Sequence, residues 1–294
     1  MALGTVEPQT CGGVLVRRGG GWSVRFVRCD AGAGPCWARI DGEAVRVLSG
    51  APYAGGQETG EVRMLRGLSL LPPAEPSKLL CVGLNYKDHR DDERGSDRIL
   101  ADIIAANMKD APPTREPILF LKAPSALLAP GAPIMLPPEA SRVDYEAELA
   151  VVIGRRIRRA RDRAEAAAAI FGYTMANDVS ARDVQERDVQ WMRAKSFDSF
   201  CPLGPWIETE FDPADRRIEG LLNGSARQVA STRFLIADPA ELVRFASQAM
   251  TLEPGDVFLT GTPSGLGGLR PGDVFTVRIE GLGELTNPVV TEPA

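Results

Sequence analysis

The chain has 294 residues, of which 44% are hydrophobic and 25% are charged, and its formal net charge is −5. This composition is typical of a globular protein, and the length suits one large domain or a main domain with a small companion. Nucleic acid and membrane are not expected as partners. No basic stripe with interleaved aromatic residues occurs, and no apolar run approaches the roughly 20 residues that span a bilayer.

Cysteine and histidine usage narrows the possible chemistry. The five cysteines are odd in number and form no C-x-x-C pair, which argues against a zinc knuckle or a disulfide framework. His89 is the single histidine, so three-His and two-His metal sites are excluded within one chain. Any metal site should therefore be rich in oxygen ligands, which favours Mg²⁺ or Mn²⁺. The opening MALGTVEPQT has no signal-peptide pattern, and we expect a cytoplasmic location.

The first part of the chain, residues 1–71, is predicted to be a small β-rich domain. Residues 21–28 alternate as a strand, and residues 36–48 carry Asp41-Gly42 between two alternating arms, which predicts a hairpin. The proline-rich segment that follows is a candidate linker. We therefore expect a second domain over residues 78–294.

The second part mixes short strands with a few helices. A helix is predicted over residues 99–110, and another over residues 162–173, where Asp162 as N-cap has Glu165 three residues later. Asp238 is the predicted N-cap of a further helix. The two copies of PGDVF, at 254–258 and 271–275, are predicted to be turns that lead into strands. Since no βαβ alternation and no dinucleotide-binding glycine loop occur, we predict a mostly β fold with α elements.

The run VDYEAELAVVIG, residues 143–154, has the length and composition of a strand. Side chains alternate along a strand, so Glu146 and Glu148 should lie on one face, about 7 Å apart. Two like charges there repel and lose hydration. A divalent cation would compensate; the alternative is the solvated face of an edge strand. Asp178, at the end of the next apolar run, would complete an all-oxygen metal site.

Two later segments add polar groups. Lys195 lies in an apolar context, WMRAKSF, and residues 260–267, TGTPSGLG, offer hydroxyl and backbone N–H groups that suit an anionic carboxylate. The arginine-rich run at residues 155–165 is interpreted as a solvated turn. The aromatic residues near Lys195 are expected in the core; they are Trp191, Phe197, Phe200 and Trp206.

Six ordered blocks carry a family resemblance: VGLNYKDH, PILFLKAPSAL, DYEAELAVVIG, NDVSARDVQ, AKSFDSFCPLGPW and LTGTPSG. Together, over residues 78–290, the chain resembles the fumarylacetoacetate hydrolase family. The region before residue 71 resembles, more loosely, the small N-terminal domain of bacterial members. The resemblance implies a mixed β-sandwich roll that assembles as a homodimer.

The resemblance also implies a site. Glu146, Glu148 and Asp178 would hold Mg²⁺ or Mn²⁺, which binds the 2-oxo acid end of an acylpyruvate-type substrate. Such chelation disperses the negative charge of an enolate, and Lys195 would stabilise the same charge. Binding of the substrate or support of the metal site is implied for four residues that match polar positions of the family: Lys122, Arg182, Gln185 and Thr262.

His89 matches the general base of the family, which is normally paired with a glutamate three residues later. Here Asp92 occupies the third position and Glu93 the fourth. Both spacings place the carboxylate on the same helical face as His89, so either could orient the imidazole. The following segment, residues 95–114, is longer than in simpler members and could re-aim a lid over the site.

The leading hypothesis is a metal-dependent hydrolase of C–C bonds in acylpyruvates or 2,4-diketo acids, in which His89 activates water. An isomerase or decarboxylase would use the same enolate without attack by water, on hydroxymuconate-like, heptadiene-dioate-like or oxaloacetate-like substrates. A third hypothesis, from another class, is a non-catalytic paralogue that binds a keto acid. In each case the expected partner is a small 2-oxo or diketo carboxylic acid.

Overall fold

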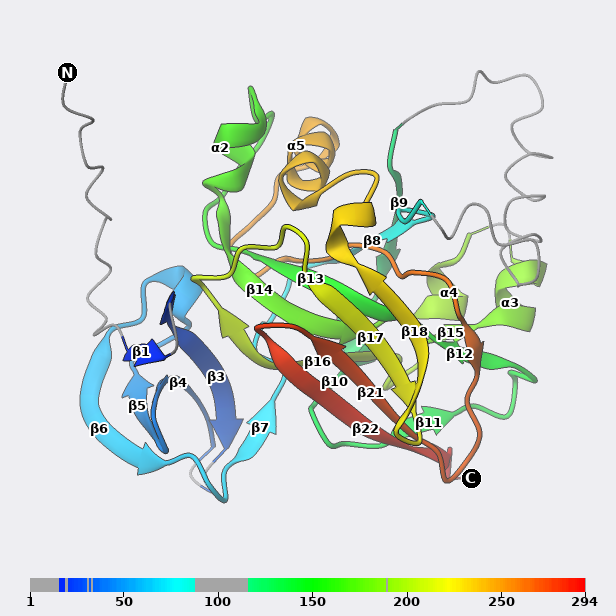
Figure 1. Ribbon diagram of the computed structural model, residues 1–294, viewed down its shortest axis with the longest axis horizontal. Coiled ribbons are helices and arrows are strands. Elements are labelled where there is room, and N and C mark those ends of the chain that lie inside the picture. The colour runs from blue at the N-terminus through cyan, green and yellow to red at the C-terminus, as the bar shows by residue number, and fades with distance from the viewer. Residues whose placement is uncertain are drawn as a thin grey trace.

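The computed structural model describes residues 16–18, 21–30, 32, 34–87, 116–188 and 190–293. The helix predicted over residues 99–110 lies outside these ranges. Figure 1 shows a mostly β fold with a few short helices, which confirms the predicted fold class. Among the described residues, no helix has the length and apolarity needed to span a bilayer.

The strands of the first part of the chain form a curved sheet, made by β3 to β7, and a separate two-stranded sheet, made by β1 and β2 (Figure 1). They are β1 (Val16–Arg18), β2 (Gly21–Ser23), β3 (Arg25–Asp30), β4 (Pro35–Asp41), β5 (Ala44–Leu48), β6 (Glu58–Met64) and β7 (Ser69–Leu71). The predicted hairpin is confirmed, because β4 and β5 pair up to Asp41 and Ala44 around Gly42, whose φ is +64°.

The remaining strands and helices belong to the second part. The strands are β8 (Leu79–Gly83), β9 (Ile118–Lys122), β10 (Leu127–Leu128), β11 (Ile134–Leu136), β12 (Val143–Tyr145), β13 (Ala147–Ile153), β14 (Ile170–Asn177), β15 (Ser180–Ala181), β16 (Cys201–Glu208), β17 (Arg217–Leu222), β18 (Ser225–Ser231), β19 (Val257–Leu259), β20 (Gly267–Gly268), β21 (Val274–Ile279) and β22 (Gly283–Thr291). The α-helices of the described residues are α2 (Arg163–Ala167), α3 (Arg182–Arg187), α4 (Met192–Lys195) and α5 (Pro239–Ala249).

One large sheet runs through both parts of the chain, in the order β6-β5-β4-β3-β16-β14-β13-β19-β8-β9. The junction is the antiparallel pairing of β3 with β16, where Phe26 faces Ile207 and Arg25 faces Glu208. The Glu208 carboxylate accepts hydrogen bonds from the backbone N–H of Val24 and from the Arg25 side chain. The division at residues 71 and 78 stays a prediction, and these contacts show that backbone pairing crosses it.

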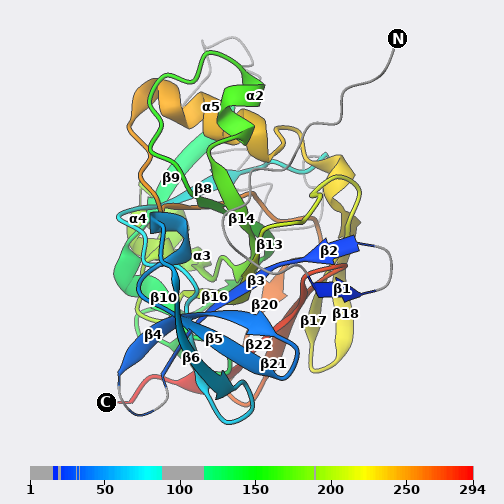
Figure 2. The same cartoon turned by 90° about the vertical axis from the view of Figure 1, so that its left-hand side faces the viewer.

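A second, five-stranded sheet packs on one face of the large sheet, in the order β11-β22-β21-β17-β18. The two sheets enclose the main apolar core, with Leu149 of β13 on one side and Phe275 and Val277 of β21 on the other. Helices α2 and α5 cover the opposite face (Figures 1 and 2), where Val151 and Ile153 pack with Leu242. Strand β13 therefore lies between two apolar layers, which is why it is buried along its whole length.

Two predicted elements differ from the structure. The strand predicted over residues 143–154 is broken at Glu146, between β12 and β13. The helix predicted over residues 162–173 is only α2, since Ile170 already pairs with Ile153 in the sheet. Its start is confirmed, because the Asp162 carboxylate accepts a hydrogen bond from the backbone N–H of Glu165 at 2.8 Å. The alanine run favours a helix locally, and the strand pairing outweighs that preference.

The proline-rich segment is fixed to the second part by Asp256, which is fully buried in the first PGDVF turn. Its Oδ1 accepts hydrogen bonds from the backbone N–H groups of Ser77 and Lys78 and from the Ser77 hydroxyl. Its Oδ2 accepts from the N–H of Glu253 and pairs with the Lys78 ammonium. Strand β19 follows directly, so one carboxylate sets the position of the linker and the entry to a central strand.

Asp256→Ala should lower the free energy of unfolding by about 3 kcal/mol, because several buried donors lose their acceptor together. The second PGDVF turn supplies a matched control. Asp273 lies at a more exposed turn, where it accepts from the N–H of Arg270 and from Asn223, so Asp273→Ala should cost about 1 kcal/mol. Urea unfolding of both variants measures the difference, and equal losses would contradict this role of Asp256.

Candidate metal and substrate site

Three buried carboxylates converge where β12, β13 and β14 meet. Glu146 lies in the break between β12 and β13, Glu148 on β13, and Asp178 directly after β14. One oxygen from each lies within 4.8 Å of the others, and all three side chains are buried. The backbone fixes this arrangement, because the N–H of Glu146 donates to the Asn177 side chain and the N–H of Asp178 donates to the carbonyl of Glu146. The alternative of a solvated edge strand is therefore wrong.

Two of these carboxylates are matched by buried cations. The Lys195 ammonium donates to Asp178 Oδ2 at 2.7 Å and to Glu146 Oε2 at 3.0 Å. The Lys122 ammonium donates to Asp178 Oδ1 at 2.7 Å from the other side. Burial lowers the pKa of Lys195, but Asp178 and Glu146 outweigh that effect and leave its pKa raised. Lys195 is thus a fixed positive charge at neutral pH.

Glu148 is the carboxylate that lacks such a partner. Its Oε2 accepts a hydrogen bond from the backbone N–H of Gly261 at 2.6 Å, and no described lysine or arginine forms an ion pair with it. Burial, and then repulsion by Asp178 and Glu146, raises the pKa of Glu148 well above its usual value. Three clustered carboxylates, one of them unmatched, fit a hard divalent cation such as Mg²⁺ or Mn²⁺.

Arg182, at the start of α3, organises the neighbouring groups. Its guanidinium donates to Glu146, to Asp144 Oδ2 at 3.0 Å and to Gln185 Oε1 at 2.9 Å. Asp144 is fully buried and also accepts from Arg142. The sequence interpretation gave Asp144 no role. The available signal was its place two residues before Glu146, on the same face of the predicted strand.

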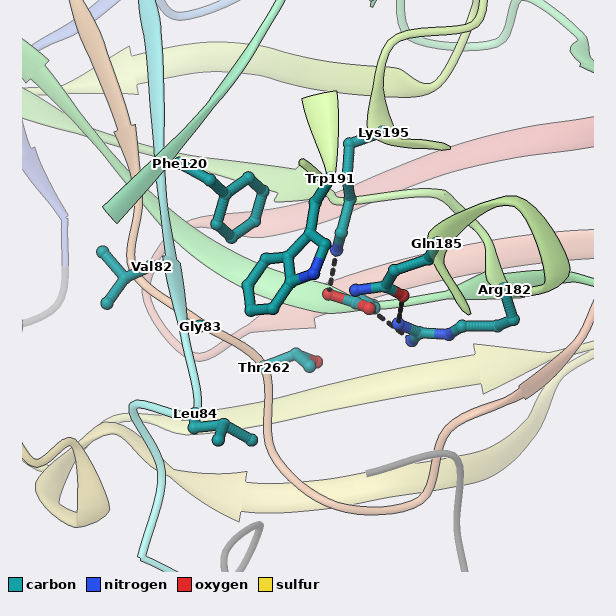
Figure 3. Close-up of a pocket in the computed structure, with 10 residues that line it drawn as sticks. Val82, Gly83, Leu84, Phe120, Arg182, Gln185, Trp191, Lys195 and Thr262 are labelled. Atoms are coloured by element: carbon teal, nitrogen blue, oxygen red, sulfur yellow. Dashed lines mark hydrogen bonds and ion pairs between the residues drawn. The ribbon is translucent and has the colours of Figure 1, made fainter. Parts of the chain in front are cut away.

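A small pocket opens beside the carboxylates (Figure 3). Its polar lining comes from Glu146, Arg182, Gln185, Lys195 and Thr262. Its apolar lining comes from Val82, Gly83, Leu84, Phe120 and Trp191. Polar groups and an apolar wall in one recess are typical of a small-molecule site.

The predicted site residues occupy different places around this pocket. Lys122 is buried behind Asp178 and is not part of the lining. Thr262 is part of it, but its hydroxyl donates to the carbonyl of Ala147 at 3.0 Å and accepts from Gln228, so its single proton is already used. The prediction that Trp191 is a core residue is wrong, because Trp191 is half-buried and lines the pocket. His89, Asp92 and Glu93 lie outside the described residues.

Comparison with known families gives matches over nearly all of the described chain. Residues 78–290 match the family described as fumarylacetoacetate (FAA) hydrolase, C-terminal. Residues 24–73 match the one described as Rv2993c-like, N-terminal. The protein Rv2993c of Mycobacterium tuberculosis is 43% identical over 277 residues, which are 91% of this chain and 98% of that protein.

Relatives that carry a named reaction fall into several classes. An oxaloacetate tautomerase of Xenopus laevis is 39% identical over 236 residues, which cover 76% of this chain and 69% of the relative. The structure of a 2-hydroxyhepta-2,4-diene-1,7-dioate isomerase from Mycobacterium marinum shares 40% identity and a TM-score of 0.80, with 92% of this chain and 100% of that one covered. A maleylpyruvate hydrolase from Sphingobium sp. SYK-6, solved with manganese(II) and pyruvate, shares 27% identity and a TM-score of 0.71 at the same coverage.

Mg²⁺ or Mn²⁺ should raise the melting temperature of the protein, and the gain should grow as the pH rises. The raised pKa of Glu148 means that its ionisation costs the metal-free fold stability as the pH rises, and a bound cation relieves that cost. At a metal concentration of about 100 times Kd, the stabilisation should be about 2.7 kcal/mol.

Glu148→Gln should abolish this gain and its pH dependence, because the amide cannot ionise. The exposed Glu210→Gln supplies a matched control and should respond to the metal as the wild type does. Thermal unfolding between pH 5 and 8, with and without Mg²⁺, provides the measurement. An unchanged response in Glu148→Gln would remove Glu148 from the metal site.

Proposed function

We propose, because the chain belongs to the fumarylacetoacetate hydrolase family, that it is a divalent-metal-dependent enzyme that hydrolyses C–C bonds in acylpyruvates or 2,4-diketo acids. The observation that carries the proposal is the unmatched Glu148 in a buried carboxylate cluster beside a pocket lined by Lys195. The expected ligand is a small 2-oxo or diketo carboxylic acid. A homodimer and a cytoplasmic location belong to the proposal through the family resemblance alone.

The metal site would consist of Glu146, Glu148 and Asp178. A Mg²⁺ or Mn²⁺ ion held there would supply Lewis-acid stabilisation for the negative charge of an enolised 2-oxo acid. Lys122 keeps the Asp178 carboxylate in place from behind, and Arg182 does the same for Glu146. These cations limit the repulsion among the carboxylates and hold the acidic cluster together.

Lys195 and Gln185 are the groups that would meet the substrate. The Lys195 ammonium lies at the pocket wall and is held by two carboxylates, so it is oriented before any ligand arrives. Donors fixed in this way stabilise developing negative charge without reorganisation. The Gln185 carbonyl oxygen accepts from Arg182, which leaves its NH₂ group directed into the pocket (Figure 3). Thr262 would contact the ligand only through a remaining lone pair.

The water-activating base in this proposal is His89, with Asp92 or Glu93 as the group that orients it. It is the single imidazole of the chain, and histidine is the side chain most often used as a general base. Proton removal from water and stabilisation of the leaving enolate are thus assigned to different residues. The two steps can be separated by mutation.

A second candidate function uses the enolate without water attack, as in an oxaloacetate tautomerase, a diene-dioate isomerase or a decarboxylase. The sequence identities between this chain and its named relatives favour this candidate. The relatives named as tautomerase and isomerase are 39% and 40% identical to this chain, whereas the solved structures named as fumarylacetoacetate hydrolase and maleylpyruvate hydrolase are 32% and 27% identical. Lys195 and the metal site would serve this chemistry equally well.

Lys195→Gln should lower kcat/KM for acetylpyruvate hydrolysis by about 100-fold or more, because a preoriented cation is lost. The assay follows the loss of diketo-acid absorbance with Mg²⁺ present, and Glu210→Gln should retain wild-type activity. A chelator should abolish turnover in the wild type. Turnover that survives chelation would contradict metal dependence, and ligand binding without any turnover would favour a non-catalytic paralogue.

His89→Ala separates the two candidate reactions. If the enzyme is a hydrolase, the variant should lose about 100-fold or more of its acetylpyruvate hydrolysis, whereas oxaloacetate tautomerisation should fall less than tenfold. Both rates come from one protein preparation. If wild type tautomerises oxaloacetate and leaves acetylpyruvate intact, the second candidate is correct. Equal loss of both rates would contradict a role for His89 in water activation alone.

A further inference from the structure

Trp191 is a pocket residue that shares a helical turn with Lys195. It is the N-cap of α4, and its carbonyl accepts a hydrogen bond from the backbone N–H of Lys195 at 3.1 Å. Residues four apart on a helix face the same side. Figure 3 accordingly shows the Trp191 indole and the Lys195 side chain next to each other at one wall of the pocket.

The orientation of the indole is fixed by its contact with β8. If Gly83 had a Cβ atom, it would lie 3.1 Å from Cζ3 of Trp191 and 3.5 Å from its Cη2. The benzene edge of the indole therefore packs against the backbone at Gly83. Cζ3 lies across the six-membered ring from the carbon that carries Nε1. The N–H edge therefore faces away from β8, and in Figure 3 the nitrogen is on the side of Lys195.

The Trp191 N–H has no hydrogen-bond acceptor among the described residues, although the ring is half-buried. An indole N–H can only donate, and tryptophan nitrogens in such places usually find a partner. The NH₂ group of Gln185 likewise has no acceptor in the described part of the chain, because Arg182 occupies only the amide oxygen. Two neutral donors without acceptors thus flank the charged Lys195 at one pocket.

The remaining surface of Trp191 is apolar. Its ring contacts Phe120 edge-on, with centroids 5.3 Å apart, and the Lys195 ammonium lies 5.1 Å from the centroid of Phe120. These rings keep water from one side of the ammonium and its ion pairs. A hydrogen bond formed beside such a wall is stronger than one formed in open solvent.

We propose that Trp191 is a substrate-binding residue whose indole N–H donates to a carboxylate or enolate oxygen of the 2-oxo acid, next to the NH₂ group of Gln185. The inference rests on the proposed function, because it assumes that the ligand presents oxygens to this pocket. It assigns to Trp191 a polar contact that the ring packing alone does not require.

The test is the affinity of the Mg²⁺-loaded protein for oxalate and for pyruvate, measured by titration calorimetry. Trp191→Phe keeps an aromatic ring and removes the donor, and it should raise the Kd of both ligands by about tenfold or more. Trp191→His restores a ring N–H and should recover at least a third of the loss in log Kd. The Kd for Mg²⁺ alone should stay within twofold of the wild-type value, because Trp191 forms no hydrogen bond with any of the three carboxylates.

Fluorescence gives a second readout. Oxalate should change the tryptophan emission of the wild type and of Trp37→Phe, a matched substitution away from the pocket, and it should leave the emission of Trp191→Phe unchanged. Equal oxalate affinity in wild type and Trp191→Phe would overturn this inference and leave the proposed function standing. Equal weakening of oxalate binding in Trp191→Phe and Trp191→His would do the same, because it would show that the indole only packs in the pocket. If the wild type bound neither ligand, the proposed function would fail, and the inference with it.

Discussion

The structure depends on the burial of Glu148 next to two other carboxylates. An uncompensated charge in that position is costly, and its repulsion by Asp178 and Glu146 adds to the cost. Lys122, Lys195 and Arg182 balance its neighbours and leave Glu148 with one backbone donor. A divalent cation would supply the missing charge, and this single requirement connects the fold to the proposed chemistry.

The fold supplies the rigidity that such a cluster needs. Strand β13 lies between β14 and β19 and is covered on both faces, so Glu148 cannot move toward solvent. The break at Glu146 lets the chain leave the small sheet of β15, β12 and β20 and enter the large sheet at β13. Asp178 follows β14 at the same edge. The pocket therefore opens where two sheets separate, and α3 and α4 bring Arg182, Trp191 and Lys195 to its rim.

Much of the site could be predicted from the sequence, because carboxylates and a lysine in apolar runs are unusual enough to be noticed. Glu146, Glu148, Asp178 and Lys195 were found in this way, and six ordered blocks gave the family. Asp144 and Trp191 were missed for a physical reason. Strand alternation does not tell where a strand breaks, and an aromatic residue in an apolar context looks the same whether it faces a core or a pocket. The helix predicted over residues 162–173 was too long because sheet pairing from Ile170 onward is a tertiary effect.

The most direct test of the central claim is a crystal structure of the protein soaked in Mn²⁺, with anomalous data collected for the metal. The account predicts one strong anomalous peak per chain, within coordination distance of oxygens from Glu146, Glu148 and Asp178 together. A peak bound elsewhere, or none at a saturating concentration of Mn²⁺, would contradict it.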